Sequence, residues 1–285
     1  MSPSLPFPLG RSHARTNDSH AVVTGAGSGI GRAFALELAA RGGRVVVSDV
    51  SPGRAKETEI VIRNSGGKAL AVECDVTQLD EVTALAATAD DWLGQSPDLV
   101  INNAGVGAGG TAVGDTPFED WQWVLNVNLW GVIHGCHVFT PRLRELSDAG
   151  KQSGIINVAS AASFAAGPGM APYNVSKAGV LALSETMAAE LSGTKVAVTV
   201  LCPTFVKTAI AEDGRITGSA AGLATRLMQL TGRSADSVAR TTLDAHDRGQ
   251  LYVLPQFDAR AVWQAKRLSP RTYTRVAGLI NRVAR

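Results

Sequence analysis

From residue 20 to residue 254, short apolar runs alternate with longer segments whose apolar residues recur at helical spacing. This alternation constrains the fold more than any other feature. The run at 44–49 contains Val45, Val46 and Val47 in succession, which is typical of a strand buried on both faces of a sheet. Because strands joined by helical crossovers pair in parallel, the sequence predicts an α/β fold with a doubly wound parallel sheet of about seven strands.

The predicted elements divide the chain into three parts. Residues 1–19 form a flexible arm, residues 20–255 form one α/β domain, and residues 256–285 form a helical extension. Strands are predicted at 21–24, 44–49, 69–73, 98–102, 155–159, 196–201 and 251–254. Helices are predicted at 31–41, 54–64, 79–93, 118–146, 173–191 and 235–247.

Composition excludes several classes of protein. The 285 residues are 45% hydrophobic and carry a net charge of only +2, which indicates a globular protein that does not act mainly on nucleic acid. The three cysteines form no close pair, which favours a reducing, cytoplasmic location. No apolar run is long enough to span a membrane. His134 and His137 lie three positions apart, but we interpret them as packing residues and expect no metal site.

A glycine-rich turn lies directly between the first predicted strand and the first predicted helix. Its sequence is Thr24-Gly25-Ala26-Gly27-Ser28-Gly29-Ile30-Gly31. Glycines permit a sharp turn and a close backbone approach to a phosphate, and the N-terminus of the following helix presents unpaired N–H groups to that phosphate. An ordinary glycine-rich turn is the alternative. The position after the first strand favours the dinucleotide site of a Rossmann-type domain.

Asp49 ends the second predicted strand, 18 residues after Gly31. A carboxylate at this place accepts hydrogen bonds from the adenosine ribose hydroxyls and repels a 2′-phosphate. Ser28 stands where a basic residue would receive that phosphate, so the sequence favours NAD over NADP. Arg44 and Arg54 lie close in sequence and keep NADP open as the alternative.

A tyrosine and a lysine open the helix predicted at 173–191. Tyr173 and Lys177 are four positions apart and therefore share a helical face. A nearby cation lowers the pKa of a phenol, which is about 10 in isolation. A Tyr-xxx-Lys pair alone is a common surface pattern. Here Ser160 follows the fifth strand and Asn102 ends the fourth, at the sheet edge where ligands bind, so we predict an acid/base site.

Together these residues resemble the short-chain dehydrogenase/reductase family over about residues 20–255, with the TGxxxGxG turn, the strand-end Asp and the YxxxK pair in the family's order. The resemblance implies an oxidoreductase that acts on CH–OH donors with NAD and interconverts a secondary alcohol and a ketone. It also implies a small-molecule substrate and a homodimer or homotetramer, joined partly through the helices at 118–146 and 173–191.

The resemblance further implies a role for each matching residue. Tyr173 is the acid/base, Lys177 binds the nicotinamide ribose and lowers the pKa of Tyr173, Ser160 steadies the substrate oxygen, and Asn128 supports a proton-relay water. The residues implied to bind the cofactor are Gly25, Ser28, Ile30 and Gly31 at the pyrophosphate, Asp49 at the ribose, Asp75 and Val76 at the adenine, Asn102, Ala104 and Gly105 beside the fourth strand, and Pro203, Val206 and Thr208 at the nicotinamide amide, together with Tyr173 and Lys177.

The sequence departs from the family's usual Pro-Gly after the sixth strand, where Pro203 is followed by Thr204. Threonine lacks the conformational freedom of glycine, which puts the local backbone path in doubt. Specificity is expected in the segments that break the alternation, 106–117, 161–172 and 204–232. The last of these is predicted to form a lid over the nicotinamide. Its apolar composition favours a lipophilic substrate, with packing of the lid on its own core as the equal alternative.

From Arg260 onward the extension is basic. No acidic residue occurs from Arg260 to Arg285, and these 26 positions hold seven cationic side chains. Beyond Pro270, four arginines cluster on one helical face, opposite an apolar face of Val276, Leu279, Ile280 and Val283. Such a helix can lie on an anionic membrane surface. Alternatively, the helix covers the mouth of the substrate site or packs against a partner subunit.

Two other functions remain open at this stage. One is a dinucleotide-binding regulator without turnover, against which the complete set of Asn128, Ser160, Tyr173 and Lys177 argues. The other is a carbonyl or ketoacyl reductase that uses NADPH, against which Asp49 argues.

Overall fold

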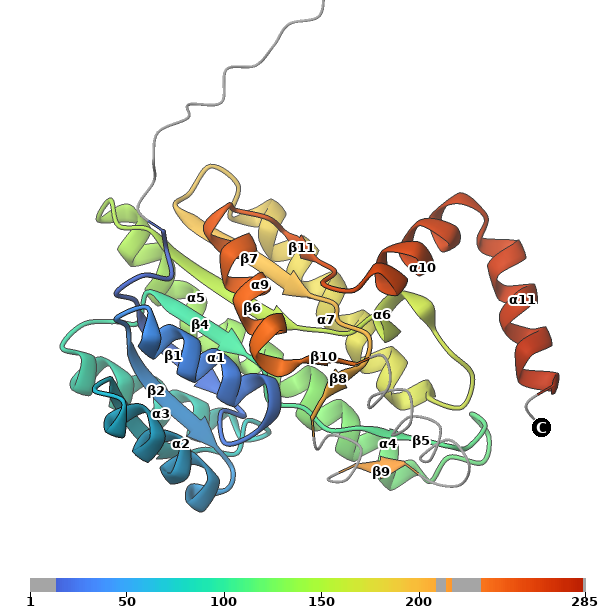
Figure 1. Cartoon of the computed structure of the whole chain (residues 1–285), viewed down its shortest axis with the longest axis horizontal. Coiled ribbons are helices and arrows are strands. Elements are labelled where there is room, and N and C mark those ends of the chain that lie inside the picture. Colours follow the sequence, from blue (N-terminus) through green and yellow to red (C-terminus); the bar gives the residue numbers. More distant parts are fainter. Residues whose placement is uncertain (1–13, 209–213, 217–231, 284–285) are drawn as a thin grey trace, which may run out of the picture.

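The structure, a computed structural model, describes residues 14–208, 214–216 and 232–283. In this part of the chain, seven parallel strands form one sheet in the order β11-β7-β6-β4-β1-β2-β3 (Figure 1). The strands are β1 (His20–Thr24), β2 (Arg44–Asp49), β3 (Lys68–Glu73), β4 (Leu99–Asn102), β6 (Ser153–Val158), β7 (Val196–Leu201) and β11 (Tyr252–Val253). This is the predicted doubly wound, Rossmann-type architecture.

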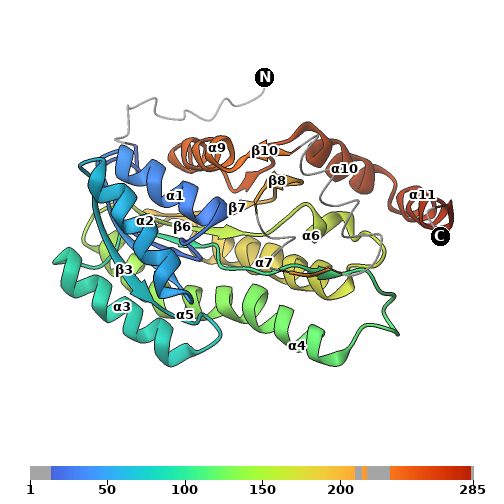
Figure 2. The same cartoon turned by 60° about the horizontal axis from the view of Figure 1, so that its bottom comes forward.

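Helices cover both faces of the sheet (Figure 2). One face carries α1 (Gly29–Ala40), α2 (Pro52–Asn64) and α9 (Ala235–Asp247), and the other carries α3 (Leu79–Leu93), α5 (Gly131–Asp148) and α7 (Ala171–Glu190). The three valines of β2 show why the strands are apolar throughout. Val45 and Val47 pack under the first set of helices and Val46 under the second, so the strand is buried from Val45 onward.

The chain reverses its direction of travel across the sheet between β1 and β4. After β1 it forms β2 and β3 on one side, then crosses back so that β4 pairs with β1 on the other side. The loops after two such strands diverge to opposite faces and leave a crevice at the carboxyl edge of the sheet. The glycine turn follows β1 at this edge, and residues 103–107 follow β4.

Smaller elements surround this crevice. The short helices are α4 (Phe118–Leu125) and α6 (Ala162–Ala165), and short parallel pairs are formed by β5 (Ala108–Gly109) with β9 (Arg215–Ile216) and by β8 (Val206–Lys207) with β10 (Arg233–Ser234). The extension consists of two helices, α10 (Phe257–Leu268) and α11 (Pro270–Val283). The break at Ser269 follows from Pro270, because the residue before a proline is disfavoured in a helix.

Several bounds shift by one or two residues, and two departures from the prediction are larger. The helix predicted over 118–146 is divided into α4 and α5 by a π-helical turn, η1 (Asn126–Trp130), a distortion that often accompanies functional sites. The flexible arm was predicted to reach residue 19, but Thr16 and Ser19 are buried. Thr16 is fully buried and bonds through its N–H and hydroxyl to the carboxylate of Asp247, at 2.9 Å each.

Candidate active site

A cavity of about 910 Å³ opens at the carboxyl edge of the sheet. It extends from the glycine turn after β1, past the end of β4, to the start of α7. Most of the predicted site residues line it: Gly25, Ser28, Ile30, Asp49, Asp75, Val76, Ala104, Gly105, Ser160, Tyr173, Lys177, Pro203, Val206 and Thr208. Gly31, Asn102 and Asn128 are not among its lining residues.

The turn between β1 and α1 has the geometry of a phosphate cradle. Gly25 and Gly29 have φ angles of +61° and +54°, a region that side chains other than glycine rarely adopt. A Cβ atom at Gly31 would collide with the carbonyl oxygen of Gly25, so glycine is needed there for packing within the turn. The first N–H groups of α1 have no partner within the helix and face this end of the cavity, where an anionic group would be stabilised.

Asp49 lies at the end of β2, beside the turn. Its Oδ2 accepts a hydrogen bond from the N–H of Gly27 at 2.9 Å, and its Oδ1 accepts one from the N–H of Ser51 at 3.0 Å. The carboxylate therefore holds the turn and keeps lone pairs available on the cavity side. Arg54 also lines the cavity at this end, so one acidic and one basic side chain flank the turn.

The structure corrects the assignment of Asn102. Its side chain is buried under the sheet, where Nδ2 donates to Oδ1 of Asn157 at 2.9 Å, and it does not line the cavity. Asn103 lines the cavity instead and donates from Nδ2 to the carbonyl oxygens of Thr24 and Gly25 at 2.9 and 3.1 Å. Successive residues at a strand end point to opposite sides, and the sequence alone did not show which asparagine faces the crevice.

Ser160, Tyr173 and Lys177 converge on one wall of the cavity. Tyr173 and Lys177 come from the first turns of α7, and the ammonium group lies 5.9 Å from the centre of the phenol ring. Lys177 is buried and donates from Nζ to the carbonyl oxygen of Val158, at the end of β6, at 2.9 Å. Ser160 follows β6 and hydrogen-bonds the phenol of Tyr173. A strand end and a helix start thus place a hydroxyl, a phenol and an ammonium side by side.

Burial controls the protonation of these groups. It raises the pKa of Tyr173, and the hydrogen bond with Ser160 opposes that shift. It lowers the pKa of Lys177 to about 8, which leaves the amine mainly protonated at neutral pH. The lowering of the pKa of Tyr173 by the charge of Lys177, which the resemblance implies, stays a prediction.

Asn128 occupies the middle of η1 and is fully buried. Its Oδ1 accepts from the N–H of Val106 at 2.7 Å, and its Nδ2 donates to the carbonyl oxygen of Val106 at 2.8 Å and to Oγ of Ser176 at 3.3 Å. A Cβ atom at Gly105 would lie 3.1 Å from Asn128 Oδ1 and 3.4 Å from Lys177 Nζ. Asn128 thus ties the loop after β4 to the start of α7, next to the lysine amine.

A sequence profile described as short chain dehydrogenase matches residues 19–219. The chain belongs to the short-chain dehydrogenase family. The fold agrees with a solved short-chain dehydrogenase/reductase from Burkholderia phymatum in complex with NAD, which is 34% identical, covers 90% of this chain and 96% of that one, and has a TM-score of 0.84.

Curated relatives of this short-chain dehydrogenase include enzymes of different length. A 1-deoxy-11-beta-hydroxypentalenate dehydrogenase from Streptomyces avermitilis is 37% identical over 244 residues, which are 85% of this chain and 86% of that one. The probable oxidoreductase EphD of Mycobacterium tuberculosis is 39% identical over 202 residues, 71% of this chain. The matching region spans only a third (33%) of the length of EphD.

Thr204 does not strain the backbone of this short-chain dehydrogenase, because its φ angle is not positive. The side chain has a use of its own. Its hydroxyl donates to Oδ1 of Asp258 at 3.1 Å, and its N–H donates to Oε1 of Gln256 at 3.2 Å. Gln256 also donates to the carbonyl oxygen of Phe205 at 3.0 Å. The loop after β7 is therefore held by the start of α10, a contact that no sequence motif indicated.

The predicted lid over 204–232 lies partly outside the described residues. Within the described part, Arg215 is anchored beside the cavity. Its N–H donates to the carbonyl oxygen of Gly107 at 2.8 Å, its guanidinium pairs with Asp120 at 2.8 Å, and it stacks 4.3 Å from the ring of Trp123, which lines the cavity. This segment therefore crosses beside the cavity in the region where we predicted substrate specificity.

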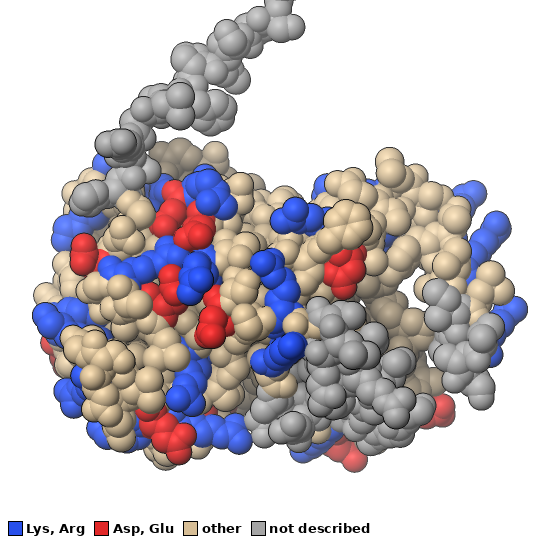
Figure 3. All heavy atoms as spheres, in the orientation of Figure 1, with Lys and Arg blue, Asp and Glu red and all other residues tan. Residues whose placement is uncertain are grey.

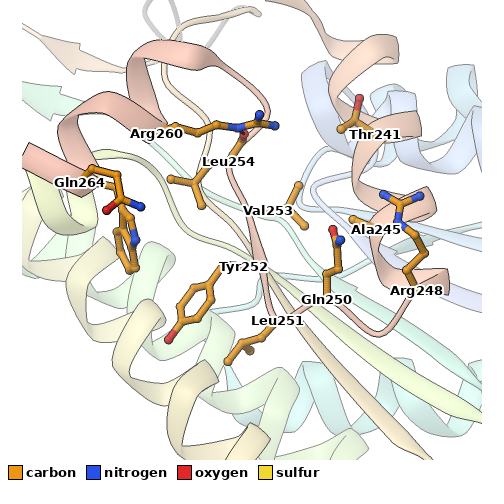
Figure 4. A pocket seen from close by; sticks show the side chains of 11 residues that line it. Thr241, Ala245, Arg248, Gln250, Leu251, Tyr252, Val253, Leu254, Arg260 and Gln264 are labelled. Atoms are coloured by element: carbon orange, nitrogen blue, oxygen red, sulfur yellow. Dashed lines mark hydrogen bonds between the residues drawn. The ribbon is translucent and has the colours of Figure 1, made fainter. Parts of the chain in front are cut away.

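A second cavity of about 560 Å³ lies between α9, β11 and α10 (Figure 4). Its lining includes Arg248, Gln250, Tyr252 and Arg260 and none of the predicted site residues. At its edge the ring of Tyr252 lies 5.3 Å from that of Trp263, so this cavity marks where α10 packs against the edge strand. The candidate active site is the cavity at the carboxyl edge of the sheet, which the predicted site residues line.

Proposed function

We propose that this short-chain dehydrogenase uses NAD(H) to interconvert a secondary alcohol and a ketone on a lipophilic substrate, with Tyr173 as the acid/base. The observation that carries the proposal is the convergence of Ser160, Tyr173 and Lys177 on the wall of a cavity whose other end is the glycine turn with Asp49. A catalytic set and a dinucleotide cradle thus share one space.

The residues present fit a nicotinamide dinucleotide. The cradle of Gly25 and Gly29 and the N-terminus of α1 suit a pyrophosphate, and the carboxylate of Asp49 suits a ribose diol. Bound there, the nicotinamide would supply the hydride acceptor or donor. Asp49 supports NAD, and Arg54 beside the turn keeps NADP as the second candidate.

The chain's own residues can transfer the proton to and from the substrate oxygen. Because burial raises the pKa of Tyr173, the phenol is protonated at neutral pH and can donate its proton to the oxygen of a ketone. Ser160 hydrogen-bonds the phenol and stabilises charge that develops on the substrate oxygen. In the oxidative direction the phenolate takes the alcohol proton, and the protonated Lys177 favours that form by its charge. We propose that Asn128 and Lys177 border the path by which the proton returns to solvent.

The shape of the cavity supports a lipophilic substrate. The wall around Ser160 is formed by mostly small, apolar residues of α6 and the segments on either side of it, Ala161, Ala162, Ala165, Gly167 and Met170. Trp123, Val127 and Phe205 lie on the cavity as well. Beyond the reacting oxygen, few polar groups are available to bind substrate, which favours a compact ring system or an acyl chain.

We further propose that the protein is a homodimer or homotetramer. Phe118 of α4, Trp130 of η1 and Val175 of α7 are large apolar side chains that are 72%, 51% and 49% exposed. These neighbouring elements are the helices through which family resemblance implies association, and burial of the three side chains would be favourable. All three cysteines, Cys74, Cys136 and Cys202, are unpaired, which supports a reducing compartment such as the cytoplasm.

The proposed chemistry is tested by a scan of secondary alcohols with NAD, followed by absorbance of the reduced nicotinamide. Tyr173→Phe should lower kcat at least about 100-fold, because a positioned acid/base contributes that much, and should leave the Kd of NADH within about twofold. Tyr252→Phe is the matched control, since its hydroxyl bonds to Glu185 outside the cavity. A Tyr173→Phe enzyme with the parent rate would refute the assignment, and no turnover of any alcohol or ketone would favour the regulator.

A further inference from the structure

The cationic side chains of the C-terminal extension fall into two groups. The first group is engaged with the protein. Arg260 donates from Nε to the carbonyl oxygen of Leu254 at 2.9 Å, Lys266 donates to the carbonyl oxygen of Phe164 at 2.5 Å, and the guanidinium of Arg267 lies 4.1 Å from the ring of Trp263. These three cations belong to α10, and Lys266 attaches the helix to α6.

The second group belongs to α11 and is free. Arg271, Arg275 and Arg282 are exposed, and none of them forms an ion pair with any residue that the structure describes. At about 100° per residue, the three side chains fall within an arc of roughly 40° on one side of the helix. A narrow stripe of unpaired arginines is unusual on a surface where cations are interspersed with acids.

A strip of α11 beside the arginines is apolar and also exposed. Val276 is 49% and Leu279 58% exposed, and at about 100° per residue they lie roughly 120° and roughly 60° around the helix from the centre of the arginine stripe. Tyr273, on the same helix, points toward the body of the protein, where its hydroxyl donates to the carbonyl oxygen of Ala165 at 2.9 Å. α11 is therefore attached at its first turn and projects from the body beyond it (Figure 1).

The charged side chains of the chain from Arg260 to Arg285 are all cationic. No acidic residue occurs between Arg260 and Arg285, so no acid within this stretch offsets the arginines. In Figure 3, Lys and Arg atoms line the outer edge of the C-terminal extension, whereas acidic and basic atoms are mixed over the body around α1 and α9. The complementary partner is an extended surface that is anionic at its boundary and apolar just below it.

We propose that α11 docks the enzyme on the surface of an anionic lipid bilayer. A helix with one cationic and one apolar side lies in the plane of the interface, with the apolar side chains below the headgroups and the arginines among the lipid phosphates. Within the described ranges, no helix combines the length and the apolar composition that crossing a membrane requires, so the contact is peripheral.

The anchoring of the extension connects this surface with the active site. Lys266 and Tyr273 bond to the last carbonyl oxygens of α6, whose small side chains form the substrate wall, and the ring of Trp263 packs edge-on against Phe164 at 4.8 Å. A bilayer held by α11 would thus lie near the wall of an apolar cavity. The docking surface goes beyond the proposed reaction and is tested without any substrate.

The experiment is flotation of the purified full-length protein with vesicles. Vesicles of phosphatidylglycerol and phosphatidylcholine in equal amounts should carry the protein, and vesicles of phosphatidylcholine alone should not. The triple variant Arg271→Gln, Arg275→Gln, Arg282→Gln should lower the partition coefficient on the order of 100-fold, because each cation near an anionic surface contributes about one factor of five. Val276→Ser with Leu279→Ser should lower it at least about tenfold.

A matched control removes the same charge elsewhere. Arg63→Gln, Lys68→Gln and Arg144→Gln change exposed cations outside the extension and should leave partition within about twofold. The Kd of NADH should be unchanged in all variants, which shows that the fold is intact and separates this proposal from the catalytic one. The proposal is overturned if the full-length protein does not float, if the control lowers partition as much as the α11 variants, or if light scattering shows that the α11 variants change the oligomeric state instead.

Discussion

Asp49 should decide between the two nicotinamide cofactors, and its replacement by asparagine isolates that role. The side chain has nearly the same shape, but one carboxylate oxygen becomes an NH₂ group that cannot accept a hydrogen bond. Gly27 and Ser51 each donate to a different oxygen of Asp49, at 2.9 and 3.0 Å, so the amide can satisfy only one of them. The unmatched N–H should lower the free energy of unfolding by about 2 kcal/mol.

The effect on cofactor choice follows from charge. A carboxylate and a phosphate charge roughly 5 Å apart repel by about 3 kcal/mol at an effective dielectric constant near 20, and physiological salt reduces this to about 2 kcal/mol. Asp49→Asn should therefore shift the ratio of the Kd values of NADPH and NADH about 30-fold toward NADPH.

Fluorescence titration of the parent and the variant with NADH and with NADPH measures this ratio, and urea unfolding measures the stability change. Asp75→Asn is the control, because Asp75 lines the same cavity but accepts only from the nearby N–H of Thr77. The reasoning is refuted if Asp49→Asn is folded and changes the ratio less than threefold, or if Asp75→Asn changes it equally. A parent enzyme that already prefers NADPH would support the second cofactor candidate and Arg54 as its ligand.

Three further predictions concern stability and the substrate wall. Burial raises the pKa of Asp98 to about 7, so the native state holds this proton more tightly than the unfolded state. The contribution of this group to the free energy of unfolding therefore falls as pH rises from 4 to 8, by at most about 4 kcal/mol. Urea unfolding at pH 5 and pH 8 should show a weaker pH dependence of stability in Asp98→Asn than in the parent, and an unchanged pH dependence would contradict the assignment. Gly135→Ala should destabilise by about 1–3 kcal/mol because the new Cβ meets the buried amide of Asn102, whereas Gly114→Ala, with open space around it, should be neutral in thermal unfolding. Lys266→Met should leave a carbonyl at the end of α6 without its donor and raise KM severalfold with kcat less affected. Restoration of KM in Lys266→Arg would separate this positioning role from loss of fold. An unchanged KM in Lys266→Met would contradict the positioning role.

Local patterns in the sequence were sufficient for the framework. The bounds predicted for 44–49, 79–93, 196–201 and 235–247 are those of β2, α3, β7 and α9. These segments carry their own periodicity, caps and turn residues, so neighbouring residues determine them. The glycine turn and Asp49 could be placed for the same reason, because the first two strands of an alternating fold determine where they lie.

Long-range packing changed the details of the site. The hydrogen bond to Asn157 holds the side chain of Asn102 under the sheet, and Asn103 lies at the crevice instead. The raised pKa of Tyr173 is a consequence of burial, and no spacing of residues reports burial. Thr204 left the backbone path after β7 in doubt from the sequence, and in the structure its hydroxyl donates to Asp258, 54 residues away.

The sequence by itself determined that this protein is a doubly wound α/β domain of the short-chain dehydrogenase family, with Tyr173 and Lys177 on one face of a helix, because periodicity and motif order depend on residues close together in the chain. Only the tertiary structure decided which side chains face the cavity, how burial sets their protonation, and that the extension is anchored to the substrate wall by Lys266 and Tyr273. These properties arise from contacts between segments up to about 100 residues apart, and local sequence patterns do not reveal contacts over such distances.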